Sequence, residues 1–351
     1  MDSVQVVVTI PLPPHLLERI RAVDARVRLT LPPPAQRHLF REGRPLPMIY
    51  QDPPPVDLSP AVEQAERARL DATLATTEVL MTPTVVPRDL LQRTPRLRWL
   101  QVTSAGIDRL HGHPILDSHV IITNASGIHA VPIAEFVLAY MLYFTKELPR
   151  ALANQRQRRW QGFVGHELHG RTVGIVGMGA IGREVARLAK ALNMRVLALR
   201  RSAAGEGSSP LADQVLPPSR LDYLLVESDY VVLAVPLTHE TRGLIGEKEL
   251  RSMKPTACLI NIARGTVVES DALARALRQG WIAAAALDVT SPEPLPPDSD
   301  LWQLPNLLIT PHMTSTTDRY VERAVGVFCD NLRRYLGGEP LLNVVDTSRG
   351  Y

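Results

Sequence analysis

The chain has 351 residues, of which 45% are hydrophobic and 21% are charged, and it carries a net charge of +3. This composition is typical of a soluble globular protein that is large enough for two ordinary domains. The small net charge argues against a nucleic-acid-binding surface.

Signals for secretion, membrane insertion and metal binding are also missing from the sequence. The N-terminus has no basic region followed by an apolar one, and the longest apolar run, Phe136 to Phe144, is too short to span a bilayer. The two cysteines, Cys258 and Cys329, have neither the spacing of a metal site nor that of a disulfide framework. We therefore expect a cytoplasmic protein with two buried thiols and without a metal, a membrane contact or a nucleic-acid partner.

Short β-branched runs alternate with amphipathic segments over the first third of the chain. This pattern predicts strands at 6–10, 27–31, 78–81 and 97–102 and helices at 16–23, 60–70 and 88–93. Proline clusters at 32–34 and 53–55 bracket a stretch to which we assign no regular structure. Because this opening has no glycine fingerprint, it need not bind a nucleotide.

The strand at 97–102 is followed by a turn of small residues, Ser104, Ala105 and Gly106, which opens a short helix. The backbone N–H groups of such a turn suit an anion such as a carboxylate. An ordinary start of a helix explains the same residues equally well, so both interpretations stay open at this point.

A long helical stretch follows a strand at 120–123, beginning at Pro132 and continuing to about Arg159. Pro149 is expected to break or kink it, because proline lacks an N–H group and clashes with the preceding turn. Since the glycine fingerprint comes only after this stretch, we interpret it as a bridge into a second domain.

Gly177, Gly179 and Gly182 stand in a G-x-G-x-x-G spacing, between the β-branched run 173–176 and the helical pattern 185–192. In such a turn the first glycine allows a tight bend, the second lets a pyrophosphate approach the backbone, and the third lets the helix pack on the strand. The N–H groups at the start of the helix then hold the pyrophosphate. Packing alone would also explain three glycines, but the flanking strand and helix favour a dinucleotide site.

The strand predicted at 194–199 ends at Arg200, Arg201 and Ser202. An NAD-binding unit of this kind places Asp or Glu at this distance from the glycines, where it binds the ribose 2′-hydroxyl. Two guanidinium groups and a hydroxyl would instead bind a 2′-phosphate through charge-assisted hydrogen bonds. We therefore predict NADP rather than NAD as the cofactor, with two solvated surface arginines as the alternative.

Strands and helices continue to alternate regularly up to the C-terminus. The pattern predicts strands at 230–235, 257–262, 283–289 and 307–310 and helices at 221–226, 247–253, 271–279 and 317–336. Strands separated by helices of this length indicate a parallel, doubly wound sheet, and the closing helix has room to return to the first domain.

The sequence therefore predicts an α/β protein of two Rossmann-like or flavodoxin-like domains with a cleft between them. We place the substrate-binding domain at 1–125 and 313–351 and the dinucleotide-binding domain at 126–312.

Three chemically useful side chains follow the ends of three successive predicted strands, where ligands bind in open α/β sheets: Arg264, Glu293 and His312. A guanidinium fork fits a substrate carboxylate, and an imidazole gives or takes a proton near neutral pH. A carboxylate in contact with that imidazole would fix the ring and favour its charged form. With a hydride donor opposite, these groups predict a 2-oxoacid reductase.

Each of these residues also has an ordinary explanation. Arg264 could be a surface ion-pair partner, Glu293 a solvated loop carboxylate, and His312 a buried ring with its hydrogen bonds satisfied. Their joint placement at three strand ends favours a site.

From Ser104 to the C-terminus, and more loosely before it, the chain resembles the D-isomer-specific 2-hydroxyacid dehydrogenases. The matching runs are Ser104–Asp108, Ala134-Glu135, Thr172–Gly177, Pro236–Thr241, Asn261–Gly265, Leu287–Val289 with Glu293–Leu295, and Thr310–His312.

This resemblance implies that Arg264 binds the substrate carboxylate, with help from the backbone around Ala105 and Gly106. It also implies that His312 is the acid/base and Glu293 its hydrogen-bonded partner. The substrate-binding residues are then Ser104, Ala105, Gly106, Arg264 and His312.

The resemblance further implies that Asp288 contacts the nicotinamide carboxamide, that Pro236 and Ala263 line the cofactor cleft, and that the protein is a homodimer built through the bridging helix. The full set of predicted cofactor-binding residues is Gly177, Gly179, Ala180, Ile181, Gly182, Arg200, Arg201, Ser202, Val235, Pro236, Thr241, Ile262, Ala263 and Asp288.

The chain departs from the family pattern in two places. Arg200-Arg201-Ser202 replaces the acidic residue of NAD-using members and resembles the NADP-using glyoxylate and hydroxypyruvate reductases. Thr314-Ser315 stands where the family usually has small Gly or Ala residues.

We therefore predict an NADPH-dependent reductase that converts a small 2-oxoacid, glyoxylate or hydroxypyruvate, to the D-2-hydroxyacid. One alternative is a dehydrogenase of a phosphorylated hydroxyacid of the 3-phosphoglycerate type. Another is a non-catalytic, corepressor-like protein whose binding is gated by a dinucleotide.

Overall fold

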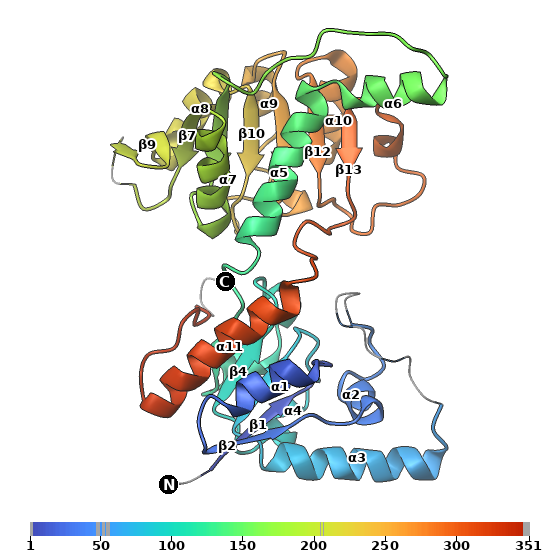
Figure 1. Ribbon diagram of the computed structural model, residues 1–351, viewed down its shortest axis with the longest axis vertical. Helices are drawn as coiled ribbons and strands as arrows, with labels where there is room; N and C mark the ends of the chain where they lie inside the picture. The colour runs from blue at the N-terminus through green and yellow to red at the C-terminus, as the bar shows by residue number, and fades with distance from the viewer. Residues whose placement is uncertain are drawn as a thin grey trace. The chain divides into compact units, whose positions relative to one another are not determined.

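The computed structural model describes residues 3–46, 50, 53, 57–203, 205 and 207–346. The chain divides into two compact units (Figure 1). Unit 1 comprises Met1–Ile128 and Thr316–Tyr351, and unit 2 comprises His129–Ser315. The boundaries lie close to 125/126 and 312/313, where the sequence analysis places them.

The described part of unit 1 contains a five-stranded parallel sheet with the order β2-β1-β3-β4-β5. The strands are β1 (Val4–Val8), β2 (Val27–Thr30), β3 (Val79–Thr82), β4 (Trp99–Val102) and β5 (Ile121–Thr123). Val6 of β1 lies opposite Val79 of β3, and Val79 lies opposite Trp99 of β4. This strand order is that of a flavodoxin-like sheet.

Helices cover both faces of this sheet, because side chains alternate between the faces along each strand. The helices are α1 (Pro14–Arg21), α2 (Pro34–Phe40), α3 (Pro60–Ala75), α4 (Leu90–Arg93) and α11 (Tyr320–Gly337). Val6 and Val8 belong to the core that α1 and α11 complete, whereas Val7 belongs to the core beneath α2, α3 and α4. The C-terminal helix α11 is thus part of unit 1 (Figure 1).

Helix α2 corrects the prediction that residues 32–57 have no regular structure. Pro34 lies in the first turn of this helix, where the missing N–H group removes no helical hydrogen bond. Leu39 and Phe40 are buried, so tertiary packing stabilises a segment whose proline content argues against helix. Residues 47–49, 51–52 and 54–56 of the same stretch lie outside the described residues.

In unit 2, the described residues form an eight-stranded sheet with the order β13-β12-β11-β10-β6-β7-β9-β8. Its strands are β6 (Thr172–Val176), β7 (Arg195–Leu199), β8 (Gly207–Ser209), β9 (Ala212–Leu216), β10 (Tyr230–Leu233), β11 (Cys258–Asn261), β12 (Ala284–Leu287) and β13 (Leu307–Ile309). The described pairings are parallel except between β8 and β9. This edge hairpin is not among the predicted elements, because β8 is a polar, exposed segment without an alternating pattern.

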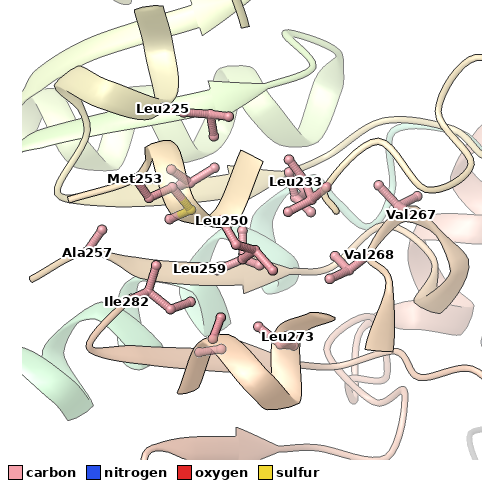
Figure 2. Packing of buried hydrophobic residues seen from close by; sticks show 14 of the residues in the cluster. Leu225, Leu233, Leu250, Met253, Ala257, Leu259, Val267, Val268, Leu273 and Ile282 are labelled. Carbon is pink, nitrogen blue, oxygen red and sulfur yellow. The ribbon is translucent and has the colours of Figure 1, made fainter. Parts of the chain in front are cut away.

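Helices pack on both faces of this sheet as well: α5 (Ala130–Thr145), α7 (Ala180–Ala191), α8 (Leu221–Glu227), α9 (Glu247–Ser252) and α10 (Ser270–Gln279). On one face, Leu225 of α8, Leu250 of α9 and Leu273 of α10 share a core with Leu233 of β10 and Leu259 of β11 (Figure 2). Helices α5 and α7 pack together on the opposite face. The two parallel, helix-covered sheets confirm the predicted fold class.

The helical stretch predicted from Pro132 to about Arg159, with a break or kink at Pro149, consists of two helices, α5 and α6 (Leu148–Arg156). The chain breaks before Pro149, at Glu147, whose φ of 52° is left-handed. Pro149 therefore lies in the first turn of α6, a position that tolerates proline, and does not kink a continuous helix.

Short 3₁₀ helices complete the secondary structure at Asp108–Leu110, Pro114–Asp117, Pro218–Arg220, Gly265–Val267 and Asp300–Gln303. Both cysteines are buried, as predicted, and this burial raises the pKa of the Cys258 and Cys329 thiols. Within the described ranges, no helix is both long and apolar enough to cross a membrane.

Candidate active site

The glycine turn lies between β6 and α7, near the middle of the unit 2 sheet. Gly177 has a φ of +108°, and a Cβ placed there would lie 2.4 Å from the carbonyl oxygen of Ala234. A Cβ at Gly182 would lie 2.0 Å from the carbonyl oxygen of Gly177. The first and third glycines are therefore required for close packing of the turn.

Gly179 differs from these two, because a Cβ placed there meets no atom within 4 Å. It is the N-cap residue of α7, and because glycine has no side chain, the first N–H groups of the helix have no side-chain cap. Ala180 and Ile181 begin the first turn of the helix. Open space in front of an uncapped helix start fits a dinucleotide pyrophosphate, which binds to N–H groups at the positive end of the helix dipole.

Strands β6 and β10 are neighbours at the point where the strand order reverses, which is where open α/β sheets bind ligands. Val235 and Pro236 follow β10. Val235 lies beside the glycine turn, because its Cγ1 would lie 3.0 Å from a Cβ placed on Gly177. The Thr241 hydroxyl donates to the Pro236 carbonyl at 2.7 Å and so closes the turn. Ile262 and Ala263, which follow β11, are buried next along the same edge. These predicted cofactor residues thus follow the carboxyl ends of adjacent strands.

Arg200, Arg201 and Ser202 form an exposed turn directly after β7. The Arg200 N–H donates to the Leu216 carbonyl of β9 at 3.0 Å, and the Arg200 carbonyl accepts the Ala203 N–H. The missed strand β9 therefore fixes the backbone at the start of this turn. Its sequence, Ala-Asp-Gln-Val-Leu, has no apolar alternation.

Arg264 lies in a turn that the buried side chain of Asn261 organises. The Asn261 amide donates to the Arg264 carbonyl at 2.9 Å and accepts the Ala263 N–H at 3.0 Å. The Arg264 guanidinium is half-buried and donates to the Ala263 carbonyl at 2.8 Å. Sequence reasoning missed the role of Asn261, although an asparagine at the start of a turn often bonds the backbone two or three residues on.

Gly265 brings the Arg264 turn against the segment that follows β12. A Cβ placed on Gly265 would lie 2.0 Å from the Thr290 carbonyl oxygen and 2.6 Å from the Ser291 nitrogen. Because these are backbone atoms, neither can rotate away, so the close approach requires glycine.

We expect Gly265→Ala to push these two segments apart and to lower both the melting temperature and activity. Forcing a methyl group into a packed site costs about 1–3 kcal/mol, which corresponds to a loss of several degrees in Tm for a domain of this size. Thermal unfolding followed by circular dichroism measures the change. Gly207→Ala is the control, because a Cβ there meets no atom within 4 Å, and equal melting temperatures for both variants would contradict the argument.

His312 and Glu293 are in direct contact. The ring Nδ1 of His312 lies 2.6 Å from Oε1 of Glu293, and both side chains are partly exposed, at 44% and 42%. His312 follows β13 and has a left-handed φ of 50°, which is uncommon for a residue with a side chain. Its N–H donates to the Asp288 carbonyl at 2.8 Å, so the backbone after β12 stabilises this conformation.

The Asp288 carboxylate is buried and accepts four hydrogen bonds from the segment that carries His312. Oδ1 accepts the Thr310 hydroxyl at 2.6 Å and the Met313 N–H at 3.0 Å. Oδ2 accepts the Thr314 hydroxyl at 2.6 Å and the Thr314 N–H at 3.2 Å. Tyr140 of α5 extends this network, since its hydroxyl lies 2.6 Å from the Thr310 hydroxyl. The sequence singled out Thr314 only as a departure from a pattern and Thr310 only as part of a matching run, and it gave no signal for Tyr140.

The three predicted catalytic residues follow the carboxyl ends of β11, β12 and β13, which are adjacent strands of unit 2. The structure brings Glu293 and His312 into contact and packs the Arg264 turn on the segment that leads to Glu293. Among the residues that the structure describes, no three His, Cys, Asp or Glu side chains gather as metal ligands.

Ser104, Ala105 and Gly106 belong to unit 1, where they follow β4. The Ser104 hydroxyl donates to the Gly106 carbonyl at 3.0 Å, and the Asn124 amide donates to the Ala105 carbonyl at 2.8 Å. The turn is thus tied to the end of β5, and the 3₁₀ helix Asp108–Leu110 follows it.

Comparison with known proteins identifies the family. Residues 138–314 match the family model of the D-isomer specific 2-hydroxyacid dehydrogenase, NAD binding domain. A glyoxylate reductase of Thermococcus gammatolerans is 38% identical over 260 residues, which are 72% of this chain and 77% of that protein. Glyoxylate/hydroxypyruvate reductase B of Pectobacterium atrosepticum is 37% identical over 318 residues, 84% of this chain and 98% of that protein.

The fold is also shared with solved structures. A D-isomer specific 2-hydroxyacid dehydrogenase from Xanthobacter autotrophicus, solved in complex with NADPH and MES, superimposes with a TM-score of 0.77 at 27% identity and covers 100% of both chains. The resemblance stated from the sequence is thereby confirmed, and unit 2 contains a family dinucleotide-binding domain. The chain belongs to the D-isomer specific 2-hydroxyacid dehydrogenase family of oxidoreductases.

Proposed function

We propose that this enzyme reduces a small 2-oxoacid, glyoxylate or hydroxypyruvate, to the D-2-hydroxyacid with NADPH. The observation that carries the proposal is the 2.6 Å contact between His312 and Glu293. These residues follow β13 and β12, and β12 is the neighbour of β11, which leads to Arg264. The names of the two curated relatives support the same substrate class.

In the proposal, each of the three residues has a different role. Arg264 binds the substrate carboxylate with its guanidinium fork. Because Glu293 bonds Nδ1 of His312, the proton passes to the carbonyl oxygen from Nε2, the other ring nitrogen. Glu293 holds the ring in the orientation for this transfer through the same contact.

Bound nicotinamide supplies the hydride for the carbonyl carbon. In the proposal, the Gly177–Gly182 turn with the first N–H groups of α7 holds the pyrophosphate, as Gly179 leaves room for it. Val235, Pro236 and Thr241 lie on one side of the turn, and Ile262 and Ala263 follow the next strand. In the proposal, Asp288 lies near the nicotinamide end.

Initial rates with glyoxylate, hydroxypyruvate and 3-phosphohydroxypyruvate, each with NADPH and with NADH, test the proposed function. We expect the highest kcat/KM with NADPH and one of the first two acids. A preference for the phosphorylated acid would favour a 3-phosphoglycerate type of dehydrogenase. Absence of turnover with tight NADPH binding would favour the non-catalytic, corepressor-like function.

We expect Arg200→Asp to shift the cofactor preference toward NADH. The change removes a charge-assisted hydrogen bond to the 2′-phosphate, worth about 1.5–3 kcal/mol, and places a repelling carboxylate there. The ratio of kcat/KM for NADPH to that for NADH should therefore fall at least about tenfold. Arg251→Asp, which makes the same charge change at an exposed arginine paired with Glu247, should leave the ratio unchanged. A wild-type enzyme that already prefers NADH would contradict the proposed cofactor.

A homodimer is part of the proposal. Leu148 and Leu152 of α6, together with Trp160 and Val164, are exposed apolar side chains that follow the bridging helix α5. Exposed apolar side chains are candidates for a protein–protein interface. Sedimentation velocity of the whole chain tests this assembly.

A further inference from the structure

The buried Asp288 carboxylate holds the backbone of the His312 segment through consecutive residues. The Asp288 carbonyl accepts the His312 N–H, and the carboxylate accepts the N–H groups of Met313 and Thr314. One residue at the end of β12 thus receives three successive backbone donors from the turn after β13. These hydrogen bonds hold the His312 backbone in its left-handed conformation. The backbone conformation in turn sets the direction in which the imidazole ring points.

The hydroxyl groups of Thr314 and Thr310 complete the set of donors to Asp288. Each lies 2.6 Å from its carboxylate oxygen, so each oxygen accepts one hydroxyl and one N–H. A carboxylate has about four lone-pair sites. Residues 310–314 therefore supply a full set of donors to the Asp288 side chain.

Tyr140 orients Thr310 from helix α5. Because the Thr310 hydroxyl gives its proton to Asp288, its oxygen accepts from the Tyr140 hydroxyl, and the order of donation runs from Tyr140 through Thr310 to Asp288. Burial raises the pKa of Tyr140, and the nearby Asp288 charge raises it further. The phenol therefore keeps the proton that it donates.

We propose that Thr314 and Tyr140 are positioning residues that act through Asp288 to hold His312 in place for proton transfer. The inference rests on the proposed acid/base role of His312. Neither residue touches the reacting atoms in this assignment. Both set the conformation of residues 312–314, and Thr314 does so with a hydroxyl that the Gly or Ala usual at this position does not offer.

Thr314→Val and Thr314→Ser in the full-length chain test the assignment. Valine removes the hydroxyl at nearly constant shape, and we expect kcat with glyoxylate and NADPH to fall about ten- to a hundredfold, because a small misplacement of a reacting group has effects of this size. The KM values for glyoxylate and NADPH should change less than about twofold, since the Thr314 hydroxyl contacts neither substrate in this assignment. Serine retains the hydroxyl and should restore kcat.

Tyr140→Phe should lower kcat in the same way but less, because it removes only the outer bond of the network. Tyr230→Phe is its matched control. Tyr230 is also buried and also bonds a threonine hydroxyl, that of Thr145, but it has no link to Asp288. We expect this control to retain the wild-type kcat, and circular dichroism establishes that each variant is folded.

Hydrogen exchange of the 310–316 peptide provides a readout that does not depend on turnover. The amides of Met313 and Thr314 should exchange faster in Thr314→Val and Tyr140→Phe than in wild type or Tyr230→Phe. If wild type reduces no 2-oxoacid, the proposed function fails, while the exchange experiment still reports on the positioning network. Unchanged exchange, an unchanged kcat in Thr314→Val, or an equal loss in Thr314→Ser would overturn the assignment.

Discussion

Replacing His312 by alanine is expected to lower kcat for 2-oxoacid reduction by about 10²–10⁴-fold, the usual contribution of a positioned general acid. In the proposed mechanism the ring protonates the carbonyl oxygen, and its Nδ1 contact with Glu293 leaves Nε2 for this transfer. Binding of NADPH, measured by fluorescence titration, should be unchanged because the glycine turn lies on other strands.

Two further variants make this test specific. Glu293→Gln keeps the size of the side chain but removes its charge, so we expect a smaller loss of kcat than in His312→Ala. His169→Ala removes an exposed imidazole from the same unit and should retain full activity. A His312→Ala enzyme as active as the His169→Ala control would remove His312 from the mechanism.

Arg264→Ala is expected to have the second largest effect, a strong rise in the KM for the 2-oxoacid together with a lower kcat. Hydrogen bonds to charged groups contribute about 1.5–3 kcal/mol each, so loss of the guanidinium fork should lower kcat/KM by at least about a hundredfold. Arg264→Lys retains the charge without the planar fork and should give an intermediate value. Steady-state rates over a range of glyoxylate concentrations measure these effects.

A substrate without a carboxylate shows whether Arg264→Ala impairs substrate binding or causes a general loss of structure. With a small aldehyde that lacks the carboxylate, Arg264→Ala and wild type should have similar, low activity. Arg275→Ala, which removes an exposed arginine of α10 paired with Glu247, should behave as wild type with glyoxylate. A KM for glyoxylate that is equal in Arg264→Ala and wild type would exclude the proposed role.

Local patterns predicted those parts of the fold in which a few neighbouring residues determine the geometry. The turn at Gly177 and Gly182 was predictable because only glycine fits where the structure places each Cβ within 2.4 Å of a backbone oxygen. The edge hairpin β8–β9 and helix α2 were missed, since the first lacks an apolar pattern and the second starts in a proline cluster. In both cases tertiary contacts outweigh the local signal.

The candidate site shows the same division between local and long-range information. Arg264, Glu293 and His312 could be proposed because each follows a predicted strand, and parallel strands end at one edge of a sheet. The network around Asp288 could not, because Tyr140 and Thr310 are 170 positions apart in the chain. Hydrogen bonds of this kind leave no periodicity or spacing in the sequence.

The residues proposed to bind the 2′-phosphate and those proposed to transfer the proton have separate supports in unit 2. The turn that carries the two arginines is anchored to the outermost hairpin of the sheet, whereas Arg264, Glu293 and His312 follow strands on the opposite side of β6. If the proposed roles hold, substitutions in β9 should alter the discrimination between phosphorylated and unphosphorylated ribose while the turns after β11, β12 and β13 keep their own hydrogen bonds.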